Sequence, residues 1–253
     1  MNLQDLTAFL DRELALCNFS GDCSNNGLQV EGSAEVKRAV FGVDGCLQLF
    51  EAALERQADF IFVHHGISWG GEPRRFAGAD GARLRLLFQN NISLYAAHLP
   101  LDAHPVLGNN AVLGEMIGLL DAKPCCEYAG VNIGFTGTLP GGRSLNELAA
   151  VYEQALDCRA ALFDFACRPL QRAVIVSGGG GHAALAAAAA NDAELLITGA
   201  MEHEMYHFAR ERRISVLALG HYASETTGPR AVMKTIAAEF PVECEFIDLP
   251  TGL

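Results

Sequence analysis

The sequence is poor in basic residues. Its 18 lysines and arginines are outnumbered by 30 aspartates and glutamates, which gives a formal net charge of -12. The basic residues are scattered along the chain and form no run. Because an acidic surface repels phosphate and gains little from counterion release, we expect no nucleic-acid partner.

Signals for secretion and for membrane insertion are also missing. The first residues, MNLQDLTAFLDREL, carry acids early and have neither a basic n-region nor an apolar h-region, so they predict an amphipathic helix. The longest apolar stretch, HAALAAAAANDAELLI, is interrupted by Asn191, Asp192 and Glu194. It is therefore not a transmembrane span, and we expect a soluble, cytoplasmic protein with no membrane partner.

No Cys-x-x-Cys pair occurs, although the chain has eight cysteines. Without an export signal, reduced thiols are expected rather than a disulfide framework. We interpret most of the cysteines as small core residues, because free cysteine is among the most buried residue types.

Half of the 253 residues are hydrophobic, and their pattern repeats once along the chain. Each copy predicts a strand, a glycine-containing turn, a helix and a second strand. These strands and helices are expected at 38–41, 46–57 and 58–62 in the first copy, and at 172–175, 182–191 and 193–197 in the second. Each copy continues to a third apolar run that ends in a histidine, with an acid four residues later: His98 with Asp102, and His221 with Glu225.

Any two strand–helix–strand units share an apolar pattern, but the matched histidine and acid indicate an internal duplication. Continuous apolar strands that alternate with helices indicate an α/β fold with largely parallel or mixed sheets. We therefore predict two similar α/β lobes related by the duplication, with a metal site between them. The expected ranges are 1–125 for the first lobe, 126–170 for a bridging strand and helix, and 171–253 for the second lobe, together one compact two-lobed unit.

The most unusual residues of the sequence stand at the predicted strand ends, where α/β proteins carry their working residues. Adjacent side chains on a strand point to opposite faces, so His64 and His65 can share a site only if the chain bends, which Gly66 permits. Pro100 disfavours helix at the preceding residue, which predicts an extended loop leading to Asp102. Over the second copy, the spacing of four places His221 and Glu225 on one face of a helical turn.

Imidazole and carboxylate ligands suit zinc, iron, manganese or nickel rather than calcium. One catalytic zinc takes three protein ligands, so six such residues suit two ions with a bridging carboxylate. A single histidine at a strand end is most often structural. Histidines at three predicted strand ends, two of them in matching positions of the repeat, predict a metal site instead. The predicted ligands of two divalent transition-metal ions are His64, His65, His98, Asp102, His221 and Glu225.

Five short motifs resemble the signatures of the YbgI/YqfO family, the proteins related to NGG-one-interacting factor three. They are HHG at 64–66, AHLPLDAHP at 97–105, GHYASE at 220–225, NNGLQV at 25–30 and TG at 198–199. The resemblance covers essentially the whole chain. It implies a two-lobed α/β protomer, a dinuclear metal centre on the six residues above and a ring-shaped homohexamer.

The family is often labelled GTP cyclohydrolase 1 type 2-like, which implies a nucleotide or pteridine-like substrate. One departure from its pattern is Ala200, where the resemblance leads us to expect an acid directly after Thr198 and Gly199. Glu202 is a candidate substitute beside the metal ligands. Arg74 and Arg75 are candidates to meet a phosphate or carboxylate, and the alternative is that both are only solvated.

A competing motif is His203-Glu204-Met205-Tyr206-His207, which fits the His-Glu-x-x-His pattern of metalloproteases. That hypothesis leaves the HHG and HLPLD motifs without a role. The glycine run before His182 lacks the Lys-Ser/Thr of a phosphate-binding P-loop, so we expect a tight turn there rather than an anion cradle.

The leading hypothesis is a metal-dependent hydrolase in which a metal-bound hydroxide attacks a small substrate. No independent general base stands out; Glu202 and His182 are candidates for a place in the substrate pocket. The alternative is a metal-binding or regulatory scaffold without catalysis, because a fully protein-ligated metal pair favours storage or structure.

Overall fold

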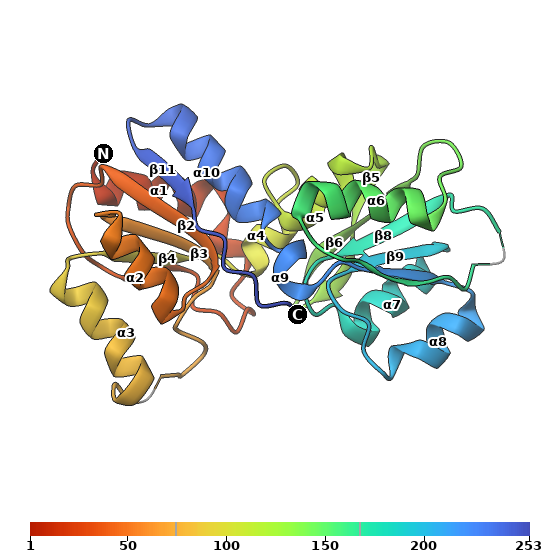
Figure 1. The fold of residues 1–253 in the computed structure, drawn as a ribbon, viewed down its shortest axis with the longest axis horizontal. Helices are drawn as coiled ribbons and strands as arrows, with labels where there is room; N and C mark the ends of the chain where they lie inside the picture. Colours follow the sequence, from red (N-terminus) through yellow and green to blue (C-terminus); the bar gives the residue numbers. More distant parts are fainter. Residues whose placement is uncertain (74, 167) are drawn as a thin grey trace. The chain divides into compact units, whose positions relative to one another are not determined.

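The structure is a computed structural model that describes residues 1–73, 75–166 and 168–253. The chain divides into two compact units, each built around its own sheet (Figure 1). The first unit comprises residues 1–101 and 228–249, and the second comprises residues 102–227 and 250–253. Sheets of five and six strands with helices on their faces confirm the predicted α/β class.

The first sheet has the strand order β1-β4-β3-β2-β11. Strands β4, β3, β2 and β11 run parallel, and β1 is antiparallel to β4. The elements of this unit are α1 (Leu3–Glu13), a short 3-10 turn (Leu16–Asn18), β1 (Gly27–Val30), β2 (Arg38–Asp44), α2 (Leu47–Glu55), β3 (Phe60–His65), α3 (Gly78–Gln89), β4 (Ser93–Ala96), most of α10 (Thr227–Glu239) and β11 (Glu243–Phe246).

Side chains on the three central strands of this sheet alternate between its two faces. Val40 and Ile61 belong to a hydrophobic cluster that also contains residues of α2 and α3. The next positions, Phe41, Phe62 and Tyr95, form a row of rings with centroids 5.6 Å and 5.7 Å apart. Helices α2 and α3 cover one face, and α1 and α10 lie on the other (Figure 1).

The second sheet has the order β5-β6-β8-β9-β10-β7, in which β8, β9 and β10 are parallel. The other three strands join antiparallel. The elements of this unit are α5 (Asn109–Met116), β5 (Leu120–Tyr128), β6 (Val131–Thr138), α6 (Leu145–Leu156), β7 (Ala161–Phe163), β8 (Arg172–Val176), α7 (Gly181–Ala190), β9 (Leu195–Thr198), α8 (Met205–Arg212), β10 (Ser215–Ala218) and α9 (His221–Ser224). A further short helix, α4 (Leu99–Ala103), spans the junction in sequence from the first unit to the second.

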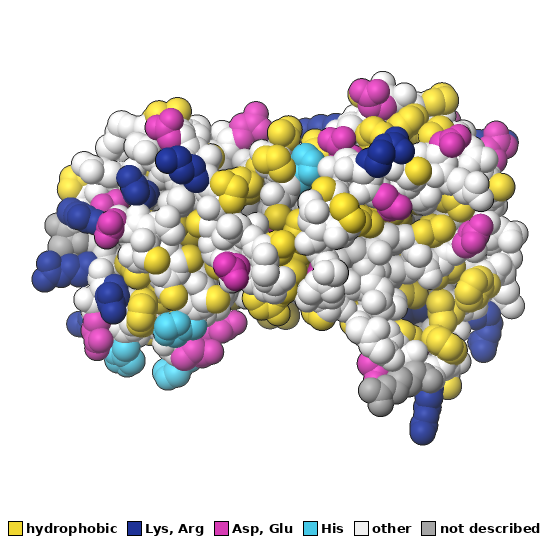
Figure 2. All heavy atoms as spheres, turned by 180° about the vertical axis from the view of Figure 1, so that it is seen from behind, with side chains coloured by type: hydrophobic (Ala, Val, Ile, Leu, Met, Phe, Trp, Pro, Cys, Tyr) yellow, Lys and Arg dark blue, Asp and Glu magenta, His cyan; other side chains and the backbone are white. Residues whose placement is uncertain are grey.

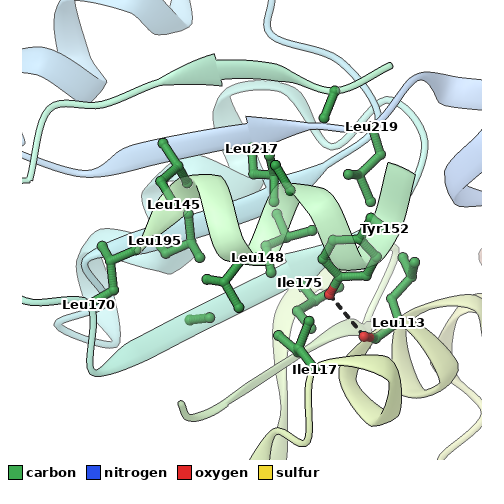
Figure 3. Packing of buried hydrophobic residues seen from close by; sticks show 14 of the residues in the cluster. Leu113, Ile117, Leu145, Leu148, Tyr152, Leu170, Ile175, Leu195, Leu217 and Leu219 are labelled. Atoms are coloured by element: carbon green, nitrogen blue, oxygen red, sulfur yellow. Dashed lines mark hydrogen bonds between the residues drawn. The ribbon is translucent and has the colours of Figure 1, made fainter. Parts of the chain in front are cut away.

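Helix α6 packs on one face of the second sheet through a buried hydrophobic cluster (Figure 3). The helix begins with the capping box that its sequence predicts: Ser144 accepts from the amide of Glu147, whose carboxylate accepts from the Ser144 amide. Tyr152 is fully buried in the cluster, and its hydroxyl donates to the carbonyl of Leu113 at 2.9 Å. Both ends of this buried polar contact are therefore satisfied.

The two sheets confirm the duplication. In the first, β3 pairs with β2 and β4 at Phe60; in the second, β9 pairs with β8 and β10 at the matching Leu195. The repeat extends further toward the N-terminus of each copy than the sequence indicates. A helix and an antiparallel edge strand precede each copy, α1 with β1 and α6 with β7, and each of these strands pairs with the third strand of its copy.

The unit boundaries differ from the ranges expected from the sequence. The segment 126–170, expected as a bridge, lies wholly in the second unit, because β6 pairs with β8 and β7 with β10. Residues 228–249 lie in the first unit, because β11 pairs with β2. Each copy of the repeat thus contributes its final strand, β5 or β11, to the sheet of the other copy.

The described residues contain no helix long and apolar enough to cross a membrane. On the face shown in Figure 2, lysine and arginine side chains stand singly or in small groups among acidic and apolar ones.

Candidate metal centre

Three histidines gather at one edge of the first sheet. His64 and His65 are the last two residues of β3, and His98 follows β4 by two residues. Because β3 and β4 are parallel neighbours, their carboxyl ends meet at the same edge. One ligand nitrogen from each of the three rings lies within 4.8 Å of the others. The local sequence pattern therefore produces a cluster of three imidazoles.

The two histidines of β3 are oriented by acceptors on β2 and on the residue that follows β4. Nδ1 of His64, which is fully buried, lies 2.9 Å from the carbonyl oxygen of Ala97. Nδ1 of His65 lies 2.9 Å from a carboxylate oxygen of Asp44, its pairing partner on β2. A carbonyl oxygen only accepts, so Nδ1 of His64 carries the proton and Nε2 is the nitrogen with a lone pair in the neutral ring.

His98 is held by Asp22, whose side chain is fully buried. Nδ1 of His98 lies 2.9 Å from Asp22 Oδ1, and Asp22 Oδ2 accepts from Asn26 at 2.8 Å and from the amide of Leu99 at 3.0 Å. Burial by itself raises the pKa of Asp22, but the hydrogen bonds from His98 and Asn26 outweigh it and lower the pKa to about 2. Asp22 is therefore an ionised acceptor at neutral pH.

The turn that carries Asp22 and Asn26 lies at this edge of the sheet because β1, the strand that follows it, runs antiparallel to β4. Strand β1 is antiparallel to β4, with Gly27 opposite Ala96, so the start of β1 lies beside the end of β4. Asn26 then accepts from the backbone amide of His98 at 2.8 Å. The NNGLQV motif at 25–30 thus has a positioning role beside the histidine cluster.

Gln29 of the same motif fixes the loop that follows the histidines of β3. Its Oε1 accepts from the amides of Ile67 at 2.8 Å and Ser68 at 3.2 Å. A Cβ at Gly66 would overlap the Gln29 carboxamide, which explains why glycine follows the histidine pair. Trp69 completes the loop and lies edge-on to His98, with ring centroids 5.0 Å apart.

In the second unit, Asp102 is buried and accepts two hydrogen bonds on the same oxygen. Its Oδ1 accepts from Asn109 Nδ2 at 2.9 Å and from the Ser177 hydroxyl at 3.1 Å. The expectation of an extended loop before Asp102 is wrong, because Leu99–Ala103 is helix α4. Pro100 is compatible with it, since the first turn of a helix does not require the proline N–H.

His221 and Glu225 lie together, as their spacing predicts. His221 begins α9, and its Nε2 lies 3.2 Å from Oε2 of Glu225, which is buried. Gly178, at φ +62°, lies against both: a Cβ there would overlap the Glu225 carboxylate and lie 3.3 Å from His221 Nε2. A Cβ at Gly199 would be 2.8 Å from the Cα of His221, so the TG motif provides a close backbone approach.

The other residues predicted for the substrate pocket, where the structure describes them, are more exposed to solvent than the predicted metal ligands. Glu202 and His182 are exposed. A Cβ at Gly181 would be 3.5 Å from Oε2 of Glu202, and the His182 ring packs edge-on against Phe208 of α8 with centroids 4.7 Å apart. Arg75 is exposed in the segment before α3. Arg74 lies outside the described residues.

The metalloprotease motif is not formed as its chemistry requires. His203 lies in a turn before α8, which begins at Met205, so His203 and His207 do not share a helix. Over the ranges that the structure describes, neither histidine belongs to a group of three or more metal-ligand side chains.

Several residues of the site were not found from the sequence. Asp22, Asp44, Asn109 and Ser177 each contact a predicted ligand, but none stands at a distinctive spacing from it. A hydrogen-bond partner that lies on a different strand leaves no periodic signal. Cys23 is a further case, because its thiol forms a second potential ligand group with Asp22 and His98.

Comparison with known proteins agrees with the motifs. The family model Duf34/NIF3 (NGG1p interacting factor 3) matches residues 1–251. A protein of Pyrococcus abyssi (strain GE5 / Orsay) named "GTP cyclohydrolase 1 type 2 homolog" is 40% identical over 254 residues, covering 100% of both chains. Among solved structures, "protein ybgI, unknown function" is 33% identical with a TM-score of 0.92, again over 100% of both chains. A protein of Thermus thermophilus is 37% identical with a TM-score of 0.90 over the same full lengths. The chain therefore belongs to the Duf34/NIF3 (NGG1p interacting factor 3) family.

Proposed function

We propose that this protein binds two divalent transition-metal ions and uses them to hydrolyse a small substrate. The observation that carries the proposal is the common orientation of three histidines: His64, His65 and His98 each engage Nδ1 with an oxygen acceptor at 2.9 Å. Metal-binding histidines in proteins are held in this way, with one nitrogen on an acceptor and the other on the metal. Nε2 is then the coordinating atom of each.

The residues of the second unit fit the same role. Asp102 and Glu225 are buried carboxylates, which in proteins are paired or coordinate metals. His221 adds a third imidazole–carboxylate contact through Glu225. The two sets supply six side chains, twice the three protein ligands of a catalytic zinc, so the proposal assigns two ions from zinc, iron, manganese or nickel.

The proposed reaction is a hydrolysis. When bound, the ions supply Lewis-acid activation of water and of the substrate oxygen. Oxygen from water forms a bond to an electrophilic carbon or phosphorus, the bond to the leaving group breaks, and a proton passes from the water to the leaving group. Asp22 and Asp44 hold His98 and His65 in position during this step, and half-buried Trp69 shields the rings from bulk solvent.

The substrate class that we propose, a nucleotide or pteridine-like molecule, is supported by the names of relatives at about 40% identity, "GTP cyclohydrolase 1 type 2 homolog". A panel of nucleotides, pterins and simple phosphoesters, tested with metal-loaded protein, checks it. Turnover that is lost with the His64→Ala, His65→Ala double variant supports a hydrolase. No turnover across the panel by protein that holds its metal would favour the alternative, a metal-binding or regulatory scaffold.

Elemental analysis of the purified chain tests the metal centre itself. We expect about two transition-metal ions per chain. The His64→Ala, His65→Ala variant should lose metal, whereas the matched His203→Ala, His207→Ala variant, which removes two exposed histidines, should keep it. One ion per chain that survives the first variant and is lost in the second would overturn the six-ligand centre and favour the metalloprotease motif.

We also propose that the protein is a homohexamer, a ring by resemblance to the family. Membership of the Duf34/NIF3 family is the support for this assembly. Sedimentation velocity at micromolar concentration checks it. A species with six times the 27.0 kDa chain mass is expected, and a monomer at the same concentration would contradict the assembly.

A further inference from the structure

A cavity of about 630 Å³ lies within the first unit, between the loop that follows β3 and helix α3. This volume is within the range of about 300–1,000 Å³ that small-molecule sites occupy. The lining comes from β1, the loop that follows β3 and one face of α3, and includes Gln29, Ser68, Phe76, Leu84 and Phe88.

The lining of this cavity, which we call the α3 pocket, is polar in one part and aromatic in another. Gln29 and Ser68 bring a carboxamide and a hydroxyl. Phe76 and Phe88 bring two benzene rings that are 67% and 58% exposed, the largest exposed fractions among the phenylalanines of the described chain. Two solvent-exposed rings around a concavity are costly unless they are covered, and they provide flat apolar surfaces for a ligand.

The polar part of the α3 pocket is connected directly to the histidine cluster. The Gln29 carboxamide that lines the pocket also binds the amides of Ile67 and Ser68 and packs on Gly66, the residue after the histidine pair. Trp69, on the same loop, contacts His98 and His65 with ring centroids 5.0 Å and 6.0 Å away. A single loop therefore forms the pocket wall and touches the histidines.

We propose that the α3 pocket binds a flat, uncharged ring of the molecule on which the histidine cluster acts; this inference rests on the proposed function. A ring that packs against Phe76 and Phe88 gains apolar contact from both. Leu84 adds aliphatic surface to the same lining, and an uncharged ring is favoured there because burying a charge against apolar side chains is costly. The Gln29 carboxamide is used within the protein, where it holds the loop in place. The Ser68 hydroxyl accepts from Asn25 at 2.7 Å and keeps its own proton to donate to the bound molecule, which orients it.

The first experiment uses N-phenyl-1-naphthylamine, an uncharged aromatic dye, with the full-length protein. Trp69 is the only tryptophan of the chain, so energy transfer from tryptophan to the dye reports binding near the loop. We expect saturable transfer that the Phe76→Ser, Phe88→Ser variant weakens about ten-fold, or about 1.4 kcal/mol. The matched control is Tyr128→Ser, which removes an exposed aromatic ring (50% exposed) on β5 and should leave dye binding unchanged.

Equal dye binding by the wild type and the Phe76→Ser, Phe88→Ser variant would overturn the pocket as a ring site. The same conclusion would follow if the Phe76→Ser, Phe88→Ser variant bound the dye normally but sedimented as a smaller assembly. The two rings would then be covered by a second copy of the chain rather than by a ligand. Metal content of each variant is measured in parallel. Loss of dye binding with metal retained leaves the proposed metal centre intact, so the two proposals fail separately.

A second experiment tests whether the pocket serves the histidine cluster. 1-Naphthohydroxamic acid carries a naphthalene ring on a metal-binding hydroxamate, and acetohydroxamic acid carries the same group without the ring. We expect the ring to increase affinity at least ten-fold in metal-loaded wild type and not in the Phe76→Ser, Phe88→Ser variant. The same gain in both proteins would mean that the ring of a metal-bound ligand does not reach the pocket, and the inference would be wrong.

Discussion

His98 and Asp22 form an imidazole–carboxylate pair, with Nδ1 and Oδ1 2.9 Å apart across 76 residues of sequence. The hydrogen bonds to Asp22 outweigh the effect of burial and lower its pKa to about 2, so it accepts the Nδ1 proton throughout the neutral range. The pair fixes both the tautomer and the direction of the His98 ring. Asp44 does the same for His65.

We predict that Asp22→Asn weakens metal binding about ten- to a hundred-fold, the usual cost of losing such an outer partner. The amide keeps the shape of the side chain but not the charge that makes His98 a better ligand. The measurement is a titration against a coloured chelator, with circular dichroism to verify folding. Asp5→Asn, at an exposed position in the first turn of α1, is the control and should bind metal normally. Unchanged affinity in a folded Asp22→Asn protein would contradict this role.

Gly178→Ala is predicted to damage the His221 and Glu225 pair. A left-handed φ costs a non-glycine residue roughly 1–2 kcal/mol, and at Gly178 the new Cβ would also overlap the Glu225 carboxylate. Gly141→Ala separates these effects, because Gly141 has φ +52° and a Cβ there would meet nothing within 4 Å. Urea unfolding and metal content are measured for both. Both variants should lose stability, but only Gly178→Ala should lose metal.

The cysteines should differ sharply in reactivity. Cys125 and Cys126 are buried, and burial raises the pKa of the Cys125 thiol to about 12 and raises that of Cys126. Their thiolate fraction is therefore very small at neutral pH, and the thiolate is the reactive form. Brief labelling of the folded protein with iodoacetamide, read by peptide mass spectrometry, should modify exposed Cys17 and Cys23 first. Labelling of Cys125 at the rate of Cys17 would contradict the burial.

Tyr152→Phe is predicted to destabilise the second unit by about 1–3 kcal/mol, the cost of leaving a buried carbonyl without its donor. The substitution removes only the hydroxyl that binds the Leu113 carbonyl at 2.9 Å. Tyr128→Phe is the matched control, because Tyr128 is 50% exposed and should change stability by less than about 0.5 kcal/mol. Urea denaturation of the two proteins gives the comparison. Equal stabilities would mean that water replaces the lost hydroxyl.

The helices and parallel strands followed from the sequence because their signals are local. The capping box of Ser144 and Glu147 marks the start of α6, and the apolar runs at 58–62 and 193–197 mark strands covered on both faces. The expectation that most cysteines are core residues was less accurate. Of the seven described, Cys125 and Cys126 are buried, and the rest are exposed or partly buried.

The prediction at Pro100 failed for a specific reason. The rule that proline disfavours helix at the preceding residue concerns helix interiors, and here Leu99 and Pro100 are the first two residues of a five-residue helix. The presence of one proline therefore does not show whether a helix is interrupted at that position or begins there.

The α/β class, the duplication and the positions of the histidines at strand ends could be predicted from the sequence, because hydrophobic periodicity and turn chemistry act between near neighbours in the chain. The three-dimensional packing of the chain set which sheet each final strand joins: β11 pairs with β2, and β5 with β6. It also decided which groups orient the histidines, since Asp22 reaches His98 only because β1 runs antiparallel to β4. Strand pairing and hydrogen bonds between distant residues depend on the packing of the whole sheet, and no short window of sequence contains that information.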